Sequence, residues 1–199
     1  MSAENNEPNF PLERYIISAD DEKTVLVLFN SGWSCLSNFR AAPIKIDGVK
    51  FRSVQQYIEA QKALYINRVD LYNVIKQTYS PRKCFEIMHK VAEHIPETWN
   101  EVMLGHLKKG LVAKFKQHPE MKKHLLDTED AQLVFATSFD TYLGNGLDMI
   151  NLDCGHPSKY PGKNLLGKTL QAVREELSSK KINSKQPAVP EPEITDDDI

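Results

Sequence analysis

The sequence lacks any apolar stretch long enough to cross a membrane, which takes roughly 20 residues. Its opening, MSAENNEPNF, lacks the basic start and apolar run of a secretory signal peptide. Its 3 cysteines (Cys35, Cys84 and Cys154) lie far apart and form no CxxC pair, which favours reduced thiols over disulfides. From these absences we expect a soluble protein of the cytoplasm with no membrane partner.

Recognisable metal-binding and nucleophile motifs are also missing. The 6 histidines form no HExxH pair and no Cys/His cluster along the chain. No GxSxG elbow is present to carry a nucleophilic serine. We therefore expect neither a metal site nor another cofactor.

Neither sign of charge is in clear excess. The 25 Lys and Arg residues nearly balance the 27 Asp and Glu residues, which leaves a net charge of −2. This balance excludes the strongly basic surface that duplex nucleic acid or an anionic membrane would select. Any contact with nucleic acid is expected to be local.

The 199 residues are enough for one domain with tails. We expect a flexible N-terminal segment over residues 1–20, a folded domain over 21–178, and a disordered acidic, proline-containing tail over 179–199. Apolar residues in this tail are too few to offset chain entropy. The Lys180–Lys181 pair indicates either a weak nuclear address or a solvated stretch, so the nucleus is the alternative location.

Hydrophobic periodicity and capping signals predict an α+β fold. Strands are expected where apolar residues are β-branched or alternate, and helices where a Ser or Pro start signal precedes a helical pattern. The expected strands cover 23–29, a hairpin over 43–51 and 131–137, and the expected helices begin near 54, 81, 96, 119 and 164. We predict a predominantly helical single domain with a small antiparallel sheet.

A polar stripe runs along the first expected helix, in the segment FRSVQQYIEAQKAL (51–64). Gln55, Glu59 and Lys62 are separated by four and then three residues, so they share one helix face beside the apolar stripe. One interpretation is a solvated face with a weak Glu59–Lys62 ion pair. The other is the wall of a pocket.

A second unusual stretch is the long connection over residues 138–167. Connections of this length tend to be functional. Gly144, Gly146 and Gly162 would let the backbone approach a ligand, and Asn164 could cap a helix whose free N–H groups suit a phosphate. Glycines also serve plain turns, so both interpretations stay open.

Trp99 lies near the start of the longest expected helix. A lone tryptophan on an amphipathic helix is either a core residue or a ring on which a base stacks. Its position along the chain allows both roles.

Several motifs occur in a fixed order along the chain. They are LSNF (36–39), IDGVKFRSVQQYIEAQKAL (46–64), SPRK (80–83), Trp99, LVAKFKQHPEMKKHLLDT (111–128), FDTYLGNGL (139–147) and PGKNLLGKTLQAVREEL (161–177). Each motif is short, but their number, order and spacing are specific. Over residues 24–178 the sequence resembles the NADAR family of YbiA-like proteins.

This resemblance implies a compact, mostly helical α+β domain that binds ADP-ribose-like or ribosyl-phosphate ligands and cleaves N-glycosidic bonds. Family substrates include early riboflavin-pathway intermediates and ADP-ribose attached to guanine bases. The implied partner is a nucleotide-sugar ligand, with ADP-ribosylated nucleic acid as one form of the substrate.

The resemblance also implies the site residues. Lys62 would act as a nucleophile or a charge partner, and Asp140 would orient ribose hydroxyls. The implied catalytic residues are Gln55, Glu59, Lys62 and Asp140, and the implied substrate-binding residues are Asn38, Phe39, Trp99, Leu143, Gly144, Gly146, Lys163 and Asn164.

Two positions depart from the family pattern. Gln55 stands where the family usually has a catalytic glutamate, and Leu143 stands where it tends to have a tryptophan. A glutamine keeps the shape of glutamate but can neither carry its charge nor exchange a proton near neutral pH. The sequence thus predicts an N-glycosidase impaired by Gln55, or alternatively a catalytically inactive ADP-ribose-binding module. In the first case Gln55→Glu is expected to raise turnover.

Overall fold

The computed structural model describes residues 13–183, with side chains from residue 13 to residue 179. The strands are β1 (Glu13–Ile17), β2 (Val25–Phe29), β3 (Ile44–Ile46), β4 (Val49–Phe51) and β5 (Gln132–Phe135). The α-helices are α1 (Val54–Tyr65), α2 (Val69–Gln77), α3 (Pro81–His89), α4 (Trp99–Gln117), α5 (Pro119–Asp127) and α6 (Leu165–Asn183). Short 3-10 helices lie at Ala92–His94, Leu152–Gly155 and Pro157–Lys159. The expected predominantly helical α+β class is confirmed.

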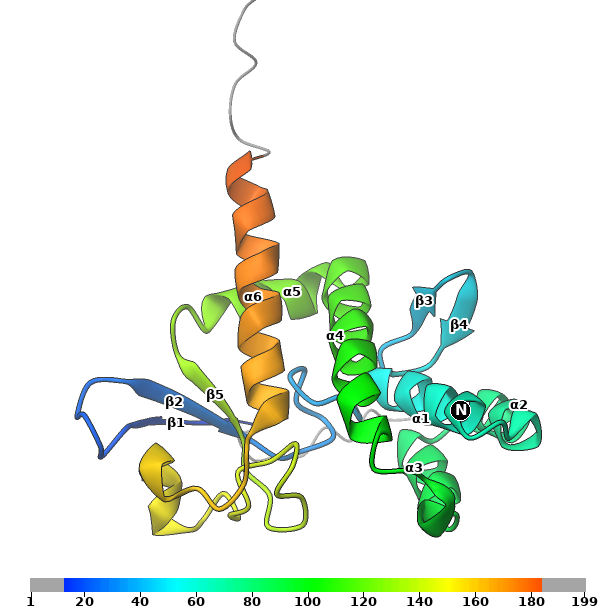
Figure 1. The fold of residues 1–199 in the computed structure, drawn as a ribbon. Helices are drawn as coiled ribbons and strands as arrows, with labels where there is room; N and C mark the ends of the chain where they lie inside the picture. Colours follow the sequence, from blue (N-terminus) through cyan, green and yellow to red (C-terminus); the bar gives the residue numbers. More distant parts are fainter. Residues whose placement is uncertain (1–12, 184–199) are drawn as a thin grey trace, which may run out of the picture.

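A three-stranded sheet with the order β1-β2-β5 forms one end of the molecule (Figure 1). The central strand β2 is a run of apolar residues and is buried from Leu26 to Phe29, as is typical of a strand covered on both faces. β1 pairs with β2 in antiparallel orientation, whereas β5 pairs with β2 in parallel, with Val27 opposite Leu133. A parallel partner needs a long crossover, and here helices α1 to α5 supply it.

The expected hairpin over residues 43–51 is confirmed as β3 and β4. Its two-residue turn consists of Asp47 and Gly48, which both have positive φ angles, 49° and 81°. Turns of this kind match the twist of the flanking strands and favour Asp-Gly.

The structure differs from the sequence-based prediction at four places. The sheet that was expected to be antiparallel also contains the parallel pair of β2 and β5. Residues 13–17 of the expected flexible segment form strand β1, because they complete the edge of the sheet against β2. Helix α2 was not expected, and α6 continues to Asn183, past the expected boundary at 178. The remaining residues of the two expected tails, 1–12 and 184–199, lie outside the part that the structure describes.

Helices α4 and α6 stand between the sheet and the group α1, α2 and α3 (Figure 1). α1 packs against α2, α3 and α4 and is buried over most of its length. Its close approach to α4 depends on Gly110, because a Cβ atom there would lie 2.9 Å from Cγ1 of Val54. None of the helices within residues 13–183 is long and apolar enough to cross a membrane.

Candidate active site

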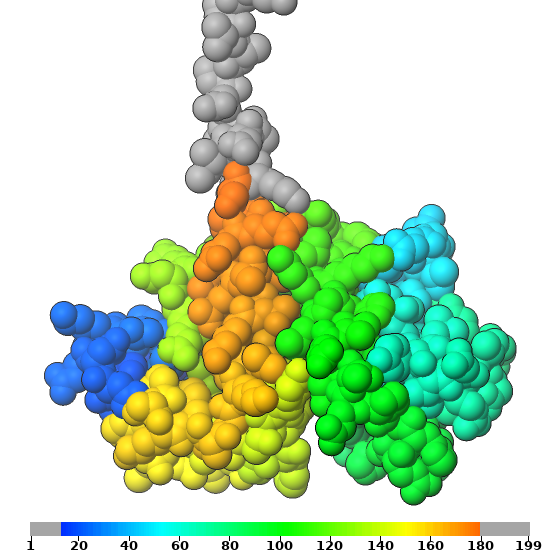
Figure 2. Space-filling model, in the orientation of Figure 1, coloured from blue at the N-terminus to red at the C-terminus, as the bar shows by residue number. Residues whose placement is uncertain are grey.

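A pocket of about 370 Å³ lies where α1, the segment leading into α4 and the loop after β5 meet. Figure 2 shows the surface hollowed between that loop (yellow-green) and the green segment before α4. Its lining residues are Gln55, Ile58, Glu59, Lys62, Phe85, Ala92, Ile95, Pro96, Glu97, Trp99, Asn100, Met103, Asp140, Tyr142 and Leu143. A concave site of this volume, apolar with a few converging polar groups, is typical of small-molecule binding.

The start of α1 fixes which of its side chains face the pocket. Ser53 caps the helix by accepting a hydrogen bond from the Gln56 N–H at 3.0 Å, as the sequence predicted. The Gln56 side chain points away from the pocket, where its Nε2 donates to the carbonyls of Ile75 and Thr78, both at 2.8 Å. These bonds hold the helix rotation that turns Gln55 into the pocket.

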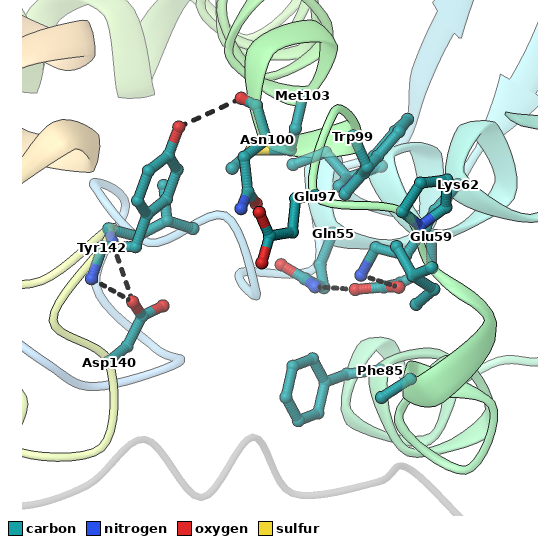
Figure 3. Close-up of a pocket in the computed structure, with 15 residues that line it drawn as sticks. Gln55, Glu59, Lys62, Phe85, Glu97, Trp99, Asn100, Met103, Asp140 and Tyr142 are labelled. Atoms are coloured by element: carbon teal, nitrogen blue, oxygen red, sulfur yellow. Dashed lines mark hydrogen bonds and ion pairs between the residues drawn. The ribbon is translucent and has the colours of Figure 1, made fainter.

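A continuous series of hydrogen bonds crosses the pocket floor (Figure 3). Asn38 Nδ2 donates to Gln55 Oε1, and Gln55 Nε2 donates to Glu59 Oε1 at 2.5 Å. Lys62 Nζ lies 2.8 Å from the other carboxylate oxygen, Oε2 of Glu59. Each oxygen of Glu59 thus has one donor, so the carboxylate is held in a single orientation.

Glu59 is a buried acid, with only 1% of its surface exposed. Burial raises the pKa of the Glu59 carboxyl, and the neighbouring Lys62 ammonium and Gln55 amide oppose that rise. The polar stripe of α1 is therefore no solvated face, since Gln55 is also buried. A buried carboxyl with a raised pKa in a pocket is a candidate for proton transfer.

The loop after β5 forms the opposite wall. Asp140 Oδ1 accepts hydrogen bonds from the N–H groups of Tyr142 and Leu143, both at 2.8 Å, which orders the turn of the loop. The Tyr142 hydroxyl donates to the Asn100 carbonyl at 3.0 Å and so ties this wall to α4 (Figure 3). Leu143, the position where the resemblance implies a tryptophan in the family, also lines the pocket.

Trp99 contributes one edge of its ring to the pocket but belongs mainly to the core. It is 4% exposed, stacks on His106 at a centroid distance of 5.7 Å, and packs on Tyr65 at 5.3 Å. The imidazole of His106 is itself fixed by the Tyr57 hydroxyl at 3.0 Å, and burial lowers its pKa. The core role and the pocket role of Trp99 thus coexist.

The predicted substrate-binding glycines lie inside the loop rather than on the pocket surface. A Cβ atom on Gly162 would lie 2.4 Å from the Gly144 carbonyl oxygen, and one on Gly144 would lie 2.4 Å from Cγ2 of Thr137. Gly146 has a positive φ of 82°. These positions need glycine because the loop folds closely on itself, which is the plain-turn interpretation.

The other predicted binding residues are not among those that line the pocket. The side-chain amide of Asn164 makes two hydrogen bonds to the backbone of β5. Its oxygen accepts from the Phe135 N–H, and its nitrogen donates to the Leu133 carbonyl. Lys163 Nζ lies 5.2 Å from the centre of the Tyr142 ring. The Phe39 ring packs edge-on against the ring of the pocket residue Phe85, with 6.1 Å between the ring centres. The Asn38 side chain donates a hydrogen bond to the pocket residue Gln55.

All four predicted catalytic residues line this one pocket, together with Trp99 and Leu143. Sequence reasoning missed Glu97, Phe85, Asn100 and Tyr142. Of these, Tyr142 lies within the glycine-rich motif FDTYLGNGL and could have been found there. Glu97 follows a proline before the long helix and carries no pattern of its own.

Comparisons with known proteins agree with the sequence resemblance. The protein-family model of the NADAR domain matches residues 27–178 of this chain. N-glycosidase YbiA of Escherichia coli is 34% identical over 145 residues, which cover 73% of this chain and 82% of that protein. An N-glycosidase of Acanthamoeba polyphaga mimivirus is 32% identical over 127 residues, covering 64% of this chain and 75% of that protein. The NMR structure of Escherichia coli YbiA superposes with a TM-score of 0.67 and 29% identity over 82% of this chain and 91% of that one.

Proposed function

The chain belongs to the NADAR domain family, and from this premise we propose that it is an N-glycosidase acting on an ADP-ribose or ribosyl-phosphate N-glycosidic bond. The observation that carries the proposal is the buried Glu59 carboxylate, held between Gln55 and Lys62 on the pocket floor. Further carboxylates, Glu97 and Asp140, line the same pocket. Such a site suits a reaction in which positive charge develops on a sugar ring.

In the proposed reaction, water attacks the anomeric carbon of the ribose and the carbon–nitrogen bond to the base breaks. Glu59 takes a proton from the attacking water and then gives it to the departing base nitrogen, so that no other proton donor is needed. The raised pKa of Glu59 suits this exchange, since a base works best when its pKa approaches the working pH. Glu59 thus supplies the charge that Gln55 lacks.

Lys62 fits the role of charge partner better than that of nucleophile. Its ammonium lies 2.8 Å from Glu59 Oε2, and an ammonium has donors but no lone pair with which to attack carbon. By pairing with Glu59 it keeps the carboxylate ionised in a buried place. Asp140 has one oxygen occupied by loop N–H groups, and we assign its other oxygen to the ribose hydroxyls.

Two cationic side chains beside pocket-lining aromatic rings could receive the phosphates of such a ligand. Lys163 lies over the Tyr142 ring, and the Arg82 guanidinium lies 5.7 Å from the centre of the Phe85 ring. Both rings line the pocket. A ligand with its ribose over Glu59 and its phosphates toward these cations would match the charges of the site.

Incubation with candidate substrates tests the proposal. We expect the purified protein to release ADP-ribose from ADP-ribosylated guanosine, or ribosyl phosphate from an early riboflavin-pathway intermediate, and Glu59→Gln to reduce the release. The matched control is Glu101→Gln, an exposed carboxylate of α4 outside the pocket. No release by the wild type from any of these substrates would contradict the proposed activity, whereas equal release by the wild type and Glu59→Gln would contradict the role of Glu59.

The second candidate function is a catalytically inactive module that binds ADP-ribose. Gln55 and Leu143 favour it, because both departures from the family pattern line the same pocket. Calorimetry separates the two functions. Micromolar binding of ADP-ribose without turnover of any candidate substrate supports the module, whereas measurable turnover excludes it.

A further inference from the structure

Away from the pocket, three side chains with metal-binding atoms meet. Glu13 comes from β1, Cys35 from the loop after β2, and His124 from α5. One ligand atom of each lies within 4.8 Å of the other two. Glu13 and His124 are 111 positions apart, so spacing along the chain could not reveal a cluster that only the fold creates.

Hydrogen bonds already arrange these groups. His124 Nε2 lies 2.7 Å from Glu13 Oε2. The Ser34 hydroxyl donates to the other carboxylate oxygen, Glu13 Oε1, at 2.6 Å. The Glu13 side chain is 7% exposed and that of His124 is 40% exposed, so solvent reaches the cluster from the α5 side.

We propose that Glu13, Cys35 and His124 bind a thiophilic divalent cation of the zinc class, with one ligand atom each and a fourth position open to water. Sulfur and imidazole ligands suit zinc, whereas magnesium and calcium require oxygen ligands. The cation replaces the thiol proton and the proton between His124 and Glu13, and both protons leave to solvent. Ser34 is a positioning residue, because it orients the carboxylate through its far oxygen.

A cation bound by Cys35 would also hold the loop after β2, which leads through Asn38 to the pocket residue Gln55. Lys114 Nζ donates to the carbonyls of Cys35 and Ser37, both at 2.7 Å, and the next residue, Asn38, bonds Gln55. The site therefore acts as a clamp on the loop, independently of the proposed N-glycosidase function.

Titration of the full chain with Co²⁺, a spectroscopic substitute for Zn²⁺, tests the site. We expect a thiolate-to-cobalt absorption band in the near ultraviolet that Zn²⁺ abolishes by displacement. The band should be lost in Cys35→Ser and kept in Cys84→Ser, a matched control because Cys84 is buried in α3. Ser34→Ala should weaken the affinity on the order of tenfold.

A second measurement needs no variant. Iodoacetamide should modify Cys35 of the wild-type protein, and Zn²⁺ should slow this reaction on the order of tenfold, because a metal-bound thiolate is shielded from attack. Peptide mass spectrometry identifies the modified cysteine. Absence of the cobalt band in the wild type, its persistence in Cys35→Ser, or an unchanged alkylation rate with Zn²⁺ would each overturn the proposal, whatever the outcome of the glycosidase assays.

Discussion

The Gln55 amide donates a hydrogen bond of 2.5 Å to the Glu59 carboxylate, one helical turn away on α1. A carboxyl group therefore lies one hydrogen bond from Gln55, the position where the resemblance implies a glutamate in the family. Because both side chains are buried on the pocket floor, they form a single amide–carboxylate unit rather than two independent residues. Gln55 itself carries no charge, so this unit has a single carboxylate, that of Glu59.

Glu59→Gln should abolish most of the activity without unfolding the protein. The substitution keeps the volume and removes the proposed base, whose loss typically costs on the order of a hundredfold to a thousandfold in rate. Lys62, 15% exposed, can turn its ammonium to solvent, so the fold should survive. Turnover and thermal unfolding of the variant check both statements. Full activity would contradict the role of Glu59.

An exchange of the two side chains gives a sharper test. Gln55→Glu alone places two carboxylates in contact, so one of them retains a proton, and the simple rise in turnover expected from the sequence should not follow. The double variant Gln55→Glu/Glu59→Gln restores one carboxylate and one amide and should recover most of the activity that Glu59→Gln loses. Turnover measured for the four proteins forms a complete cycle. A double variant no better than Glu59→Gln would show that the carboxylate must stand at position 59.

The pH dependence of kcat/KM should report the Glu59 carboxyl. Its pKa is raised above 4.5 by burial, and the proposed base acts when ionised, so activity should fall as the pH falls through that raised pKa. Lys62 lowers the pKa of Glu59, and Lys62→Met should therefore move the acidic limb to higher pH. A limb that stays at the same pH in Lys62→Met would exclude Glu59 as the titrating group.

Leu143→Trp should strengthen ligand binding. Leu143 lines the pocket, and an aromatic ring there offers a stacking surface for a base, worth roughly 1–3 kcal/mol. Calorimetry with ADP-ribose measures the gain, with Leu143→Met as the control for side-chain size. Equal or weaker binding by the tryptophan variant would mean that this wall does not face a base.

Much of the local structure was predictable because its causes are local. The Ser53 cap and the Asp47-Gly48 turn depend on neighbouring residues, and both stand where the sequence placed them. Helix α2 was missed because its cap position, Arg68, makes no side-chain capping bond, and packing of Ile75 against α1 sustains it instead. Contacts distant in sequence decide such elements.

Only part of the pocket was predictable from the sequence. Helical spacing put Gln55, Glu59 and Lys62 on one face, but the burial of that face depends on walls from α4 and from the loop after β5. Asn164 was expected to cap a helix end that suits a phosphate, and its side-chain amide bonds two backbone groups of β5. The backbone groups that Asn164 bonds are distant in the sequence, so no short motif around Asn164 could predict these contacts.

The glycines of the loop after β5 give the last prediction, which separates a structural role from a ligand-binding role. Gly162→Ala would put a Cβ atom 2.4 Å from the Gly144 carbonyl oxygen, which backbone atoms cannot avoid without a shift of the loop. We expect a loss of unfolding free energy of roughly 1–3 kcal/mol, as for other overpacked sites, together with weaker ligand binding as the Asp140 wall moves.

Gly105→Ala is the matched control for this substitution. Gly105 lies inside α4, and an added Cβ would meet nothing within 4 Å, so alanine should stabilise the helix by roughly 0.5–1 kcal/mol. Chemical denaturation of both variants and calorimetry with ADP-ribose supply the two readouts. If Gly162 served only to let a ligand approach, Gly162→Ala would bind ligand poorly at wild-type stability. The contact with Gly144 predicts that stability and binding fall together.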